Sequence, residues 1–221
     1  MQEKLIIWDF DGVIADTDSL WMKLFYQKMV KEYGYTQNFE NFYNMCSGMS
    51  AITMQNTFAK IGYELNLSFF GQVRDEFNYI ISQNFPLIEN ADTTIKNITK
   101  KQCLATGTPI SKIAWKVSLS NLSSVFNEKN SFSSELVTNG KPAPDIFLYA
   151  AQKMGFEPTD CVVVEDSLVG LQAAINASMM PIAFVGCQAN NTQQRIEKIK
   201  SLGVEHIFFD FKNLEKFISS L

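Results

Sequence analysis

Short apolar runs recur along the chain and alternate with stretches in which apolar residues have helical spacing. The runs cover residues 5–8, 102–106, 136–138, 161–164, 181–185 and 206–209. From residue 102 onward this alternation is typical of βαβ units, in which a parallel sheet is buried on both faces. The pattern therefore predicts an α/β fold with a doubly wound, Rossmann-like parallel sheet.

Two of the helices between these runs have recognisable ends. Pro142 and Pro144 precede a helical pattern that has Asp145 in its first turn and ends at Gly155, as expected for helix termini. A second helical pattern follows Asp166-Ser167, either of which can cap its N-terminus. We expect both helices to pack against the sheet.

The stretch from about 17 to 88 breaks the alternation. It contains helix-like segments near 19–35, 50–61 and 68–83, with no convincing strand between them. We therefore expect a core domain formed by residues 1–16 and 89–221, with a helical module inserted at 17–88. Its aromatic residues are expected to form the core of that module, and they include Trp21, Phe39, Phe42 and Tyr43.

Composition narrows the range of functions. The net charge is −4 and the longest basic cluster is Lys100-Lys101, which argues against a nucleic-acid partner. No apolar run approaches the ~20 residues of a membrane span, and the first ten residues lack the apolar stretch of a signal sequence. We expect a soluble, cytoplasmic protein without a membrane partner.

Cysteine and histidine usage limits the chemistry further. Four widely separated cysteines, with no C-x-x-C spacing, argue against a zinc site or thioredoxin-like redox chemistry. Because the chain contains one histidine, His206, acid–base chemistry is expected to depend on carboxylates.

Polar residues follow several of the predicted strands directly. They are Asp9, Asp11, Thr106-Gly107-Thr108, Lys141 and Glu165-Asp166. Because ligands bind outside the carboxyl ends of strands in open α/β sheets, these residues are expected to meet at one edge. Four crowded carboxylates repel one another, and one lysine cannot balance them. A Mg²⁺ ion can balance the charge of these carboxylates, because it prefers carboxylate and water oxygens as ligands.

Such a site suits phosphoryl transfer. Cations and hydrogen-bond donors neutralise the charge on the phosphoryl oxygens, and a carboxylate can attack phosphorus to form an aspartyl phosphate. A second acid two residues further on can protonate the leaving oxygen and later deprotonate water.

The sequence resembles the haloacid dehalogenase superfamily. Four segments resemble its four motifs in order, and they are D-F-D-G-V-I at 9–14, Thr106, K-P-A-P-D at 141–145 and E-D-S at 165–167. The most similar branch carries a helical cap after the first motif and includes β-phosphoglucomutases and small phosphate-ester phosphatases. Each of these residues has an ordinary structural interpretation when it is taken singly. Asp9 can be a strand-end residue, Asp11-Gly12 can form a turn and Lys141 can be a solvated lysine. The presence of all four motifs in order favours the catalytic interpretation.

The resemblance implies a role for each of these residues. Asp9 is the nucleophile, and Asp11 is the general acid/base whose backbone carbonyl also binds Mg²⁺. Thr106 and the N–H of Gly107 hold a phosphoryl oxygen, while Lys141 pairs with the nucleophile and the phosphoryl group. Besides Asp9 and Asp11, the metal shell contains Asp166 and, directly or through water, Glu165.

The resemblance also bears on the reaction type. Dehalogenases and phosphonatases of the superfamily lack the second aspartate, so Asp11 favours phosphate esters. Mutases resemble the chain more closely, but carry a histidine where this chain has Trp21 and a cap arginine near 48–51, where it has none. We predict a Mg²⁺-dependent phosphatase that hydrolyses a small phosphorylated metabolite through an aspartyl phosphate. The alternatives are a sugar-phosphate mutase or a catalytically inactive binding or regulatory member.

Overall fold

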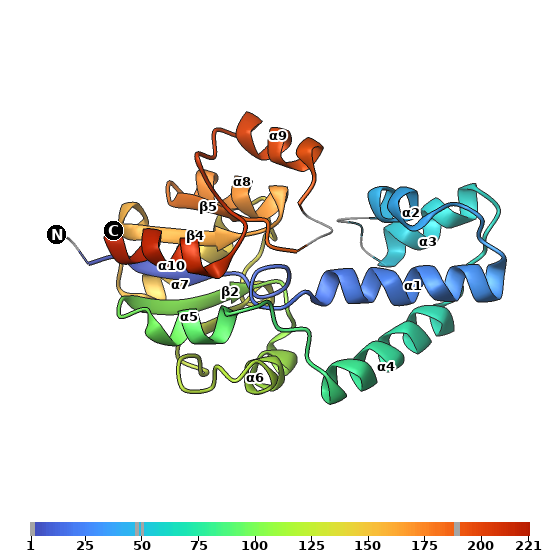
Figure 1. The fold of residues 1–221 in the computed structure, drawn as a ribbon, viewed down its shortest axis with the longest axis horizontal. Coiled ribbons are helices and arrows are strands. Elements are labelled where there is room, and N and C mark those ends of the chain that lie inside the picture. The colour runs from blue at the N-terminus through green and yellow to red at the C-terminus, as the bar shows by residue number, and fades with distance from the viewer. Residues whose placement is uncertain (1–2, 47–48, 50, 188–190) are drawn as a thin grey trace. The chain divides into compact units, whose positions relative to one another are not determined.

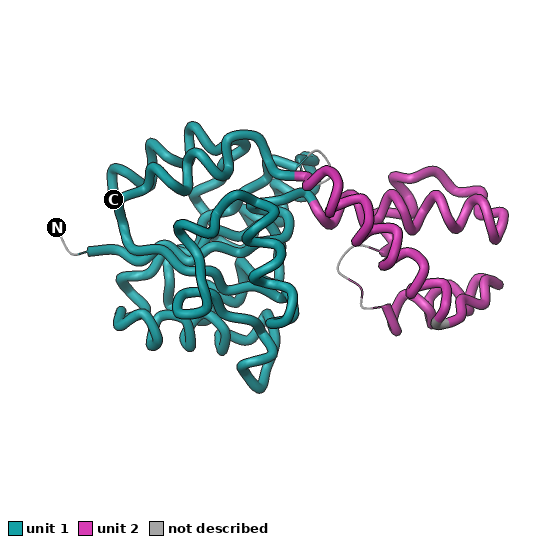
Figure 2. The backbone as a smooth tube through the Cα atoms, turned by 90° about the horizontal axis from the view of Figure 1, so that it is seen from below, with its two compact units in different colours: residues 1–16, 87–221 teal, residues 17–86 magenta. Residues whose placement is uncertain are grey.

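The computed structural model describes residues 3–46, 49, 51–187 and 191–221. The chain forms two compact units, one of Met1–Asp16 with Leu87–Leu221 and one of Thr17–Pro86 (Figure 2). The second boundary lies two residues before the predicted one. It does so because Leu87 bridges Ala15 and the N–H of Ile88 donates to the carbonyl of Ile14 at 3.0 Å.

The larger unit contains a sheet flanked by helices (Figure 1). Its six strands run in the order β3-β2-β1-β4-β5-β6, and all neighbouring strands are parallel. This confirms the predicted doubly wound α/β fold. The strands are β1 (Leu5–Trp8), β2 (Lys101–Thr106), β3 (Ser131–Ser133), β4 (Cys161–Glu165), β5 (Met180–Phe184) and β6 (His206–Phe208).

Helices cover both faces of this sheet. Leu5 and Ile7 of β1 share a buried cluster with Phe147 of α7 and Ala173 of α8. Trp8, on the alternate face, stacks on Phe211 of α10 with ring centroids 6.1 Å apart. The helices of the unit are α5 (Ala91–Asn97), α6 (Ile110–Leu119), α7 (Asp145–Met154), α8 (Leu168–Asn176), α9 (Gln193–Ser201) and α10 (Phe211–Ser220), with 3-10 turns η1 (Ser134–Leu136) and η2 (Pro158–Asp160).

The strand expected at 136–138 is wrong. The chain pairs with β2 through Ser131–Ser133 instead, with Leu104 opposite Ser131 and Thr106 opposite Ser133. Leu136 ends η1 and is 40% exposed. The true strand escapes detection because serines stand at both ends of it, and the Ser133 hydroxyl is satisfied by the carbonyl of Thr108 at 2.8 Å.

The predicted helix ends after β3 and β4 agree with the structure. Gly155 ends α7 in the left-handed conformation, with φ +76°, which glycine adopts without steric cost. Ser167 caps α8, because its hydroxyl accepts a hydrogen bond from the N–H of Gly170 at 3.0 Å.

The smaller unit is helical, and an aromatic core holds it together. Phe25 is fully buried and its ring meets those of Phe42, Phe58 and Phe69 edge-on at 5.1–5.6 Å. Phe42 is buried in this core, and Trp21, Phe39 and Tyr43 pack against it, as predicted. The helices are α1 (Thr17–Tyr33), α2 (Phe39–Cys46), which the sequence pattern did not predict, α3 (Ala51–Lys60) and α4 (Leu67–Gln83).

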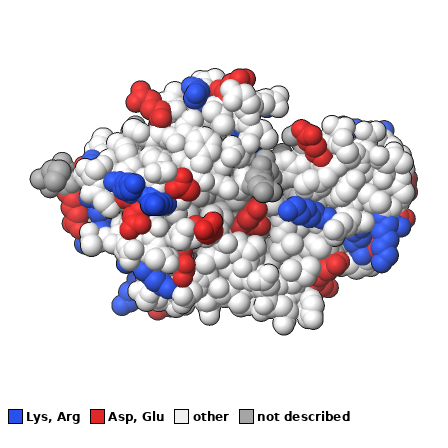
Figure 3. Space-filling view, viewed as in Figure 1, with Lys and Arg blue, Asp and Glu red and all other residues white. Residues whose placement is uncertain are grey.

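The described surface charges, cysteines and histidine can be placed in the structure. On the face in Figure 3, basic and acidic side chains are interspersed. The four cysteines are buried free thiols, and the His206 ring lies 4.5 Å from that of Phe217. None of the described helices combines the length and the hydrophobicity that crossing a bilayer demands. The cytoplasmic location stays a prediction.

Candidate active site

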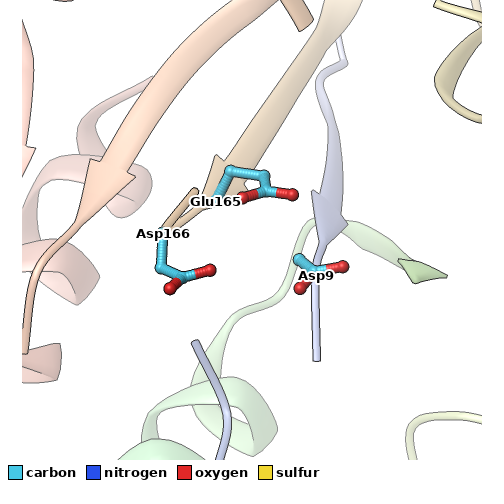
Figure 4. Close-up of side chains that lie close together, drawn as sticks. All are labelled: Asp9, Glu165 and Asp166. Carbon is cyan, nitrogen blue, oxygen red and sulfur yellow. The ribbon is translucent and has the colours of Figure 1, made fainter. Parts of the chain in front are cut away.

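Three buried carboxylates gather where β1 and β4 end. Asp9 directly follows β1, Glu165 ends β4 and Asp166 comes next, and one oxygen from each lies within 4.8 Å of the others (Figure 4). The sequence analysis expected these carboxylates at one edge of the sheet because each follows a predicted strand, whereas the adjacency of β1 and β4 comes from the structure.

The backbone brings these side chains together in two ways. The N–H of Asp9 donates to the carbonyl of Val164 at 3.0 Å, which continues the β1–β4 ladder one residue past Trp8. Two glycines then make room for the carboxylates. A Cβ on Gly12, whose φ is +81°, would collide with Asp166, and one on Gly170 would collide with Glu165.

Lys141 bridges two of the carboxylates. Its ammonium donates to Oδ1 of Asp9 at 2.9 Å and to Oε1 of Glu165 at 2.6 Å, and it lies 5.0 Å from the centre of the Phe147 ring. The other Glu165 oxygen accepts hydrogen bonds from the N–H and the hydroxyl of Ser167, at 2.7 and 2.9 Å. Glu165 therefore connects Lys141 to the N-terminus of α8.

Burial sets the protonation of this group. Burial raises the pKa of Asp9 to about 7, Lys141 acts in the opposite direction, and the charges of Glu165 and Asp11 add to the rise. Burial alone would lower the pKa of Lys141, but Asp9 and Glu165 outweigh it and raise that pKa above its ordinary value. Lys141 thus stays charged near neutral pH, while Asp9 in the metal-free protein is near its midpoint.

Asp11 has partners that the sequence analysis did not single out for it. Its carboxylate contacts the ammonium of Lys116, on α6, at 2.6 and 2.8 Å, and it accepts a hydrogen bond from the Thr108 hydroxyl at 2.8 Å. Lys116 belongs to none of the four motifs and lies in an ordinary amphipathic helix, so no pattern in one sequence distinguishes it.

Thr106 and Gly107 stand at the carboxyl end of β2, the strand beside β1. Thr106 is buried, and its hydroxyl accepts a hydrogen bond from the N–H of Thr108 at 3.1 Å. Gly107 is exposed. The predicted phosphoryl-binding residues thus lie at the same sheet edge as the carboxylates.

Arg195 is a second cation that the sequence analysis missed. From α9 it donates to the backbone carbonyl of Asp166 at 2.7 Å, and it lies 3.9 Å from a carboxylate oxygen of the same residue. Arg195 and Asp166 are 29 residues apart in the chain, so no local sequence pattern indicates this contact.

The donor set fits a divalent cation such as Mg²⁺. Three carboxylates supply oxygens, which Mg²⁺ prefers, and Gly12 keeps the space beside Asp166 free of a side chain. Asp9, Glu165 and Asp166 are the residues that could hold such an ion. Both oxygens of Glu165 already accept hydrogen bonds from the protein, and Oδ1 of Asp9 accepts one from Lys141.

Comparison with known proteins identifies the family. The family model described as haloacid dehalogenase-like hydrolase matches residues 6–184. The chain belongs to this family. The match begins in β1 and ends with β5, so it covers every site segment described above except α9, which carries Arg195.

Similar proteins agree with this assignment. The chain is 32% identical over 185 residues, 80% of its length and 79% of the relative's, to the Drosophila melanogaster protein named "Probable pseudouridine-5'-phosphatase". It is 28% identical, over 87% of this chain and 89% of the relative, to a phosphorylated carbohydrates phosphatase from Thermotoga maritima. The fold matches that of a haloacid dehalogenase-like protein of unknown function from Agrobacterium tumefaciens, with TM-score 0.86, 22% identity and 99% of both chains covered.

The family match and these relatives together make the chain a phosphoric monoester hydrolase.

Proposed function

We propose that the protein is a Mg²⁺-dependent phosphatase that hydrolyses a small phosphorylated metabolite through an aspartyl phosphate on Asp9. The observation that carries the proposal is the buried contact of Lys141 with Asp9 and Glu165, beside Asp166. The two relatives above, one named for pseudouridine 5'-phosphate and the other for phosphorylated carbohydrates, support a small substrate.

The first step transfers the phosphoryl group to the protein. A carboxylate oxygen of Asp9 attacks phosphorus, the bond from phosphorus to the ester oxygen breaks, and Asp11 gives its proton to that leaving oxygen. Lys141, Thr106 and the N–H of Gly107 stabilise the charge on the phosphoryl oxygens. The alcohol then departs.

The second step regenerates Asp9. Asp11, now ionised, takes a proton from a water molecule that attacks phosphorus, and the bond between Asp9 and phosphorus breaks to release inorganic phosphate. When bound, Mg²⁺ supplies positive charge beside the transferred group. Asp9, the backbone carbonyl of Asp11 and Asp166 would hold it directly, and Glu165 would act through water.

Two features of the chain count against a mutase, and a third counts against an inactive relic. Trp21, at the position where mutases have a histidine, packs edge-on against Phe77 at 5.6 Å, so its ring belongs to the aromatic core of the helical unit. Residues 48–51, the region where mutases carry a cap arginine, contain no arginine. Gly48 and Ser50 of this region lie outside the described residues. An inactive relic is expected to lose at least one charged motif residue, yet Asp9, Asp11, Lys141 and Asp166 are all present.

Release of phosphate from p-nitrophenyl phosphate tests the proposal. We expect turnover with Mg²⁺, none in excess EDTA, and loss of turnover in Asp9→Asn. Asp75→Asn, which changes an exposed aspartate of the helical unit, is the matched control and should be fully active. Acid quenching should trap labelled phosphate on the wild type and not on Asp9→Asn.

Full activity of Asp9→Asn, or unchanged turnover in EDTA, would contradict the proposed mechanism. Interconversion of hexose 1- and 6-phosphates would instead establish the mutase.

A further inference from the structure

Asp11, Lys116 and Thr108 form a closed triangle of polar contacts. The Lys116 ammonium contacts both carboxylate oxygens of Asp11 at 2.6 and 2.8 Å, and it donates to the Thr108 hydroxyl at 3.0 Å. That hydroxyl donates in turn to Oδ2 of Asp11 at 2.8 Å. The carboxylate is thus held at both oxygens by two side chains.

This triangle is itself anchored to the sheet. The N–H of Thr108 donates to Thr106 at the end of β2, and the carbonyl of Thr108 accepts from Ser133 of β3 at 2.8 Å. The Lys116 ammonium also lies 5.5 Å from the centre of the Phe10 ring, next to Asp11 in the chain. These contacts hold the Thr108 backbone against the strand ends and place the Lys116 ammonium beside the Phe10 ring.

The ion pair is more enclosed than a surface pair. The Lys116 side chain is 12% exposed and that of Asp11 is 23% exposed. Exposed ion pairs hold a carboxylate loosely, whereas partly buried and bidentate ones fix its geometry. A group that transfers a proton must lie within hydrogen-bond reach of the reacting oxygen, so its orientation matters.

We propose that Lys116, with Thr108, is a positioning residue that orients the Asp11 carboxyl group for proton transfer to the leaving oxygen and from water. The inference rests on the proposed function, in which Asp11 is the general acid/base. Lys116 acts through Asp11 and gives up no proton of its own. In the acid step Oδ1 of Asp11 carries the proton that passes to the leaving oxygen, while Oδ2 keeps its hydrogen bonds from Lys116 and Thr108; in the second step Oδ1 takes the proton back from water. It extends the catalytic unit from the four motifs to the second turn of α6.

Leaving-group dependence tests this role. A general acid matters more when the leaving oxygen is more basic, so phenyl phosphate depends on Asp11 more than p-nitrophenyl phosphate does. The value of kcat/KM for a series of substituted phenyl phosphates isolates the phosphorylation step, in which the leaving group departs. The Mg²⁺-loaded protein of 221 residues and its variants are compared over that series.

In Lys116→Met we expect kcat/KM for phenyl phosphate to fall about 10- to 100-fold, but for p-nitrophenyl phosphate only about 3-fold, because a misplaced acid loses part of its contribution. Lys116→Arg should restore most of the phenyl phosphate activity. Lys112→Met, which removes a lysine one turn earlier that lies over Trp115, is the matched control and should behave as wild type.

A double-mutant cycle separates positioning from general damage to the fold. The leaving-group slope is the change of log kcat/KM with the pKa of the departing phenol. If Lys116 acts through Asp11, adding Lys116→Met to Asp11→Asn should leave this slope unchanged. If Lys116→Met lacks a cooperative unfolding transition, Thr108→Val makes the same comparison, because it removes a hydroxyl without changing charge.

Three results would overturn the inference. The first is a leaving-group slope in Lys116→Met equal to that of the wild type. The second, if Thr108→Val replaces that variant, is a wild-type slope in Thr108→Val. The third is a leaving-group slope that becomes steeper when Lys116→Met is added to Asp11→Asn. Each leaves the proposed function intact if the wild type hydrolyses aryl phosphates. A wild type that hydrolyses none of them defeats the proposed function itself, and the positioning role with it.

Discussion

The Lys141 ammonium lies 2.6 Å from Oε1 of Glu165, a carboxylate whose side chain is only 1% exposed. A buried charge of this kind is tolerated because it is paired and hydrogen-bonded. Glu165 therefore fixes the position of Lys141, and through it the ion pair with Asp9.

Replacing Lys141 should damage both stability and activity. Lys141→Met leaves Asp9 and Glu165 without their shared counter-charge, and we expect the free energy of unfolding to fall by about 3–5 kcal/mol in EDTA, as for other broken buried pairs. Urea unfolding measures this. Lys153→Met, which removes an exposed lysine from the last turn of α7, should change stability little; equal losses in the two variants would contradict the structure.

Gly170 should not tolerate even a methyl group. In Gly170→Ala the new Cβ occupies the place of the Glu165 carboxylate, so Glu165 must leave Lys141 or Ser167. We expect kcat to fall at least about 10-fold, because a group that stabilises developing charge loses its position. Steady-state kinetics measures this.

Gly71→Ala is the matched control for this substitution. Gly71 also lies within a helix, α4, but its nearest neighbour to a new Cβ is 3.9 Å away. This variant should keep full activity and gain about 0.5–1 kcal/mol in stability, because alanine favours helix over glycine. Unchanged activity in Gly170→Ala would show that the Glu165 contacts are dispensable.

The metal-free protein should lose stability as the pH rises. The pKa of Asp9 is raised from 3.8 to about 7 in the folded protein. Between these two pH values the folded state keeps a proton on Asp9 that the unfolded state has released. This contribution is complete below about pH 4 and is lost as the pH rises through 7.

Between pH 5 and 8 we expect the free energy of unfolding in EDTA to fall on the order of 2–3 kcal/mol more in the wild type than in Asp9→Asn, at about 1.4 kcal/mol per pKa unit. Urea unfolding at several pH values measures the difference. Parallel pH profiles for the two proteins would show that Asp9 titrates normally. Adding Mg²⁺ should reduce the loss, because the ion favours ionised Asp9.

A buried glutamine should prove important for the stability of the sheet. Gln102 accepts a hydrogen bond from the Trp8 indole at 2.9 Å and donates to the carbonyls of Ile95 and Ile98. Gln102→Leu leaves these groups unsatisfied, which should cost about 2–4 kcal/mol of unfolding free energy. Gln152→Leu, on the exposed side of α7, is the control, and chemical unfolding compares the two.

The parts of the site that lie close to a strand end could be predicted from the sequence. Asp9, Glu165 and Asp166 follow strongly apolar strands, so their positions follow from the parallel sheet. Lys141 was placed at this edge because it follows the strand expected at 136–138, which does not form, and its role was inferred from the K-P-A-P-D motif. The contact between Asp11 and Lys116 was out of reach, because it joins the loop after β1 to α6, 105 residues away in the chain, and no local pattern encodes such a contact.

The error at β3 has a similar origin. An apolar triplet at 136–138 looked more strand-like than Ser131-Phe132-Ser133, yet backbone pairing with β2 decides which residues form the strand. Tertiary pairing overrides local preference at such short segments.

The bridge between Ala15 and Leu87 means that the chain leaves for the helical unit and returns from it at adjacent points. The seventy residues of the helical unit are therefore inserted without separating the two segments of the larger unit that they connect. Changes in the length or sequence of the insertion need not displace the sheet as long as this bridge is kept. Substitutions within the inserted helices can therefore leave the ends of the parallel strands where they are.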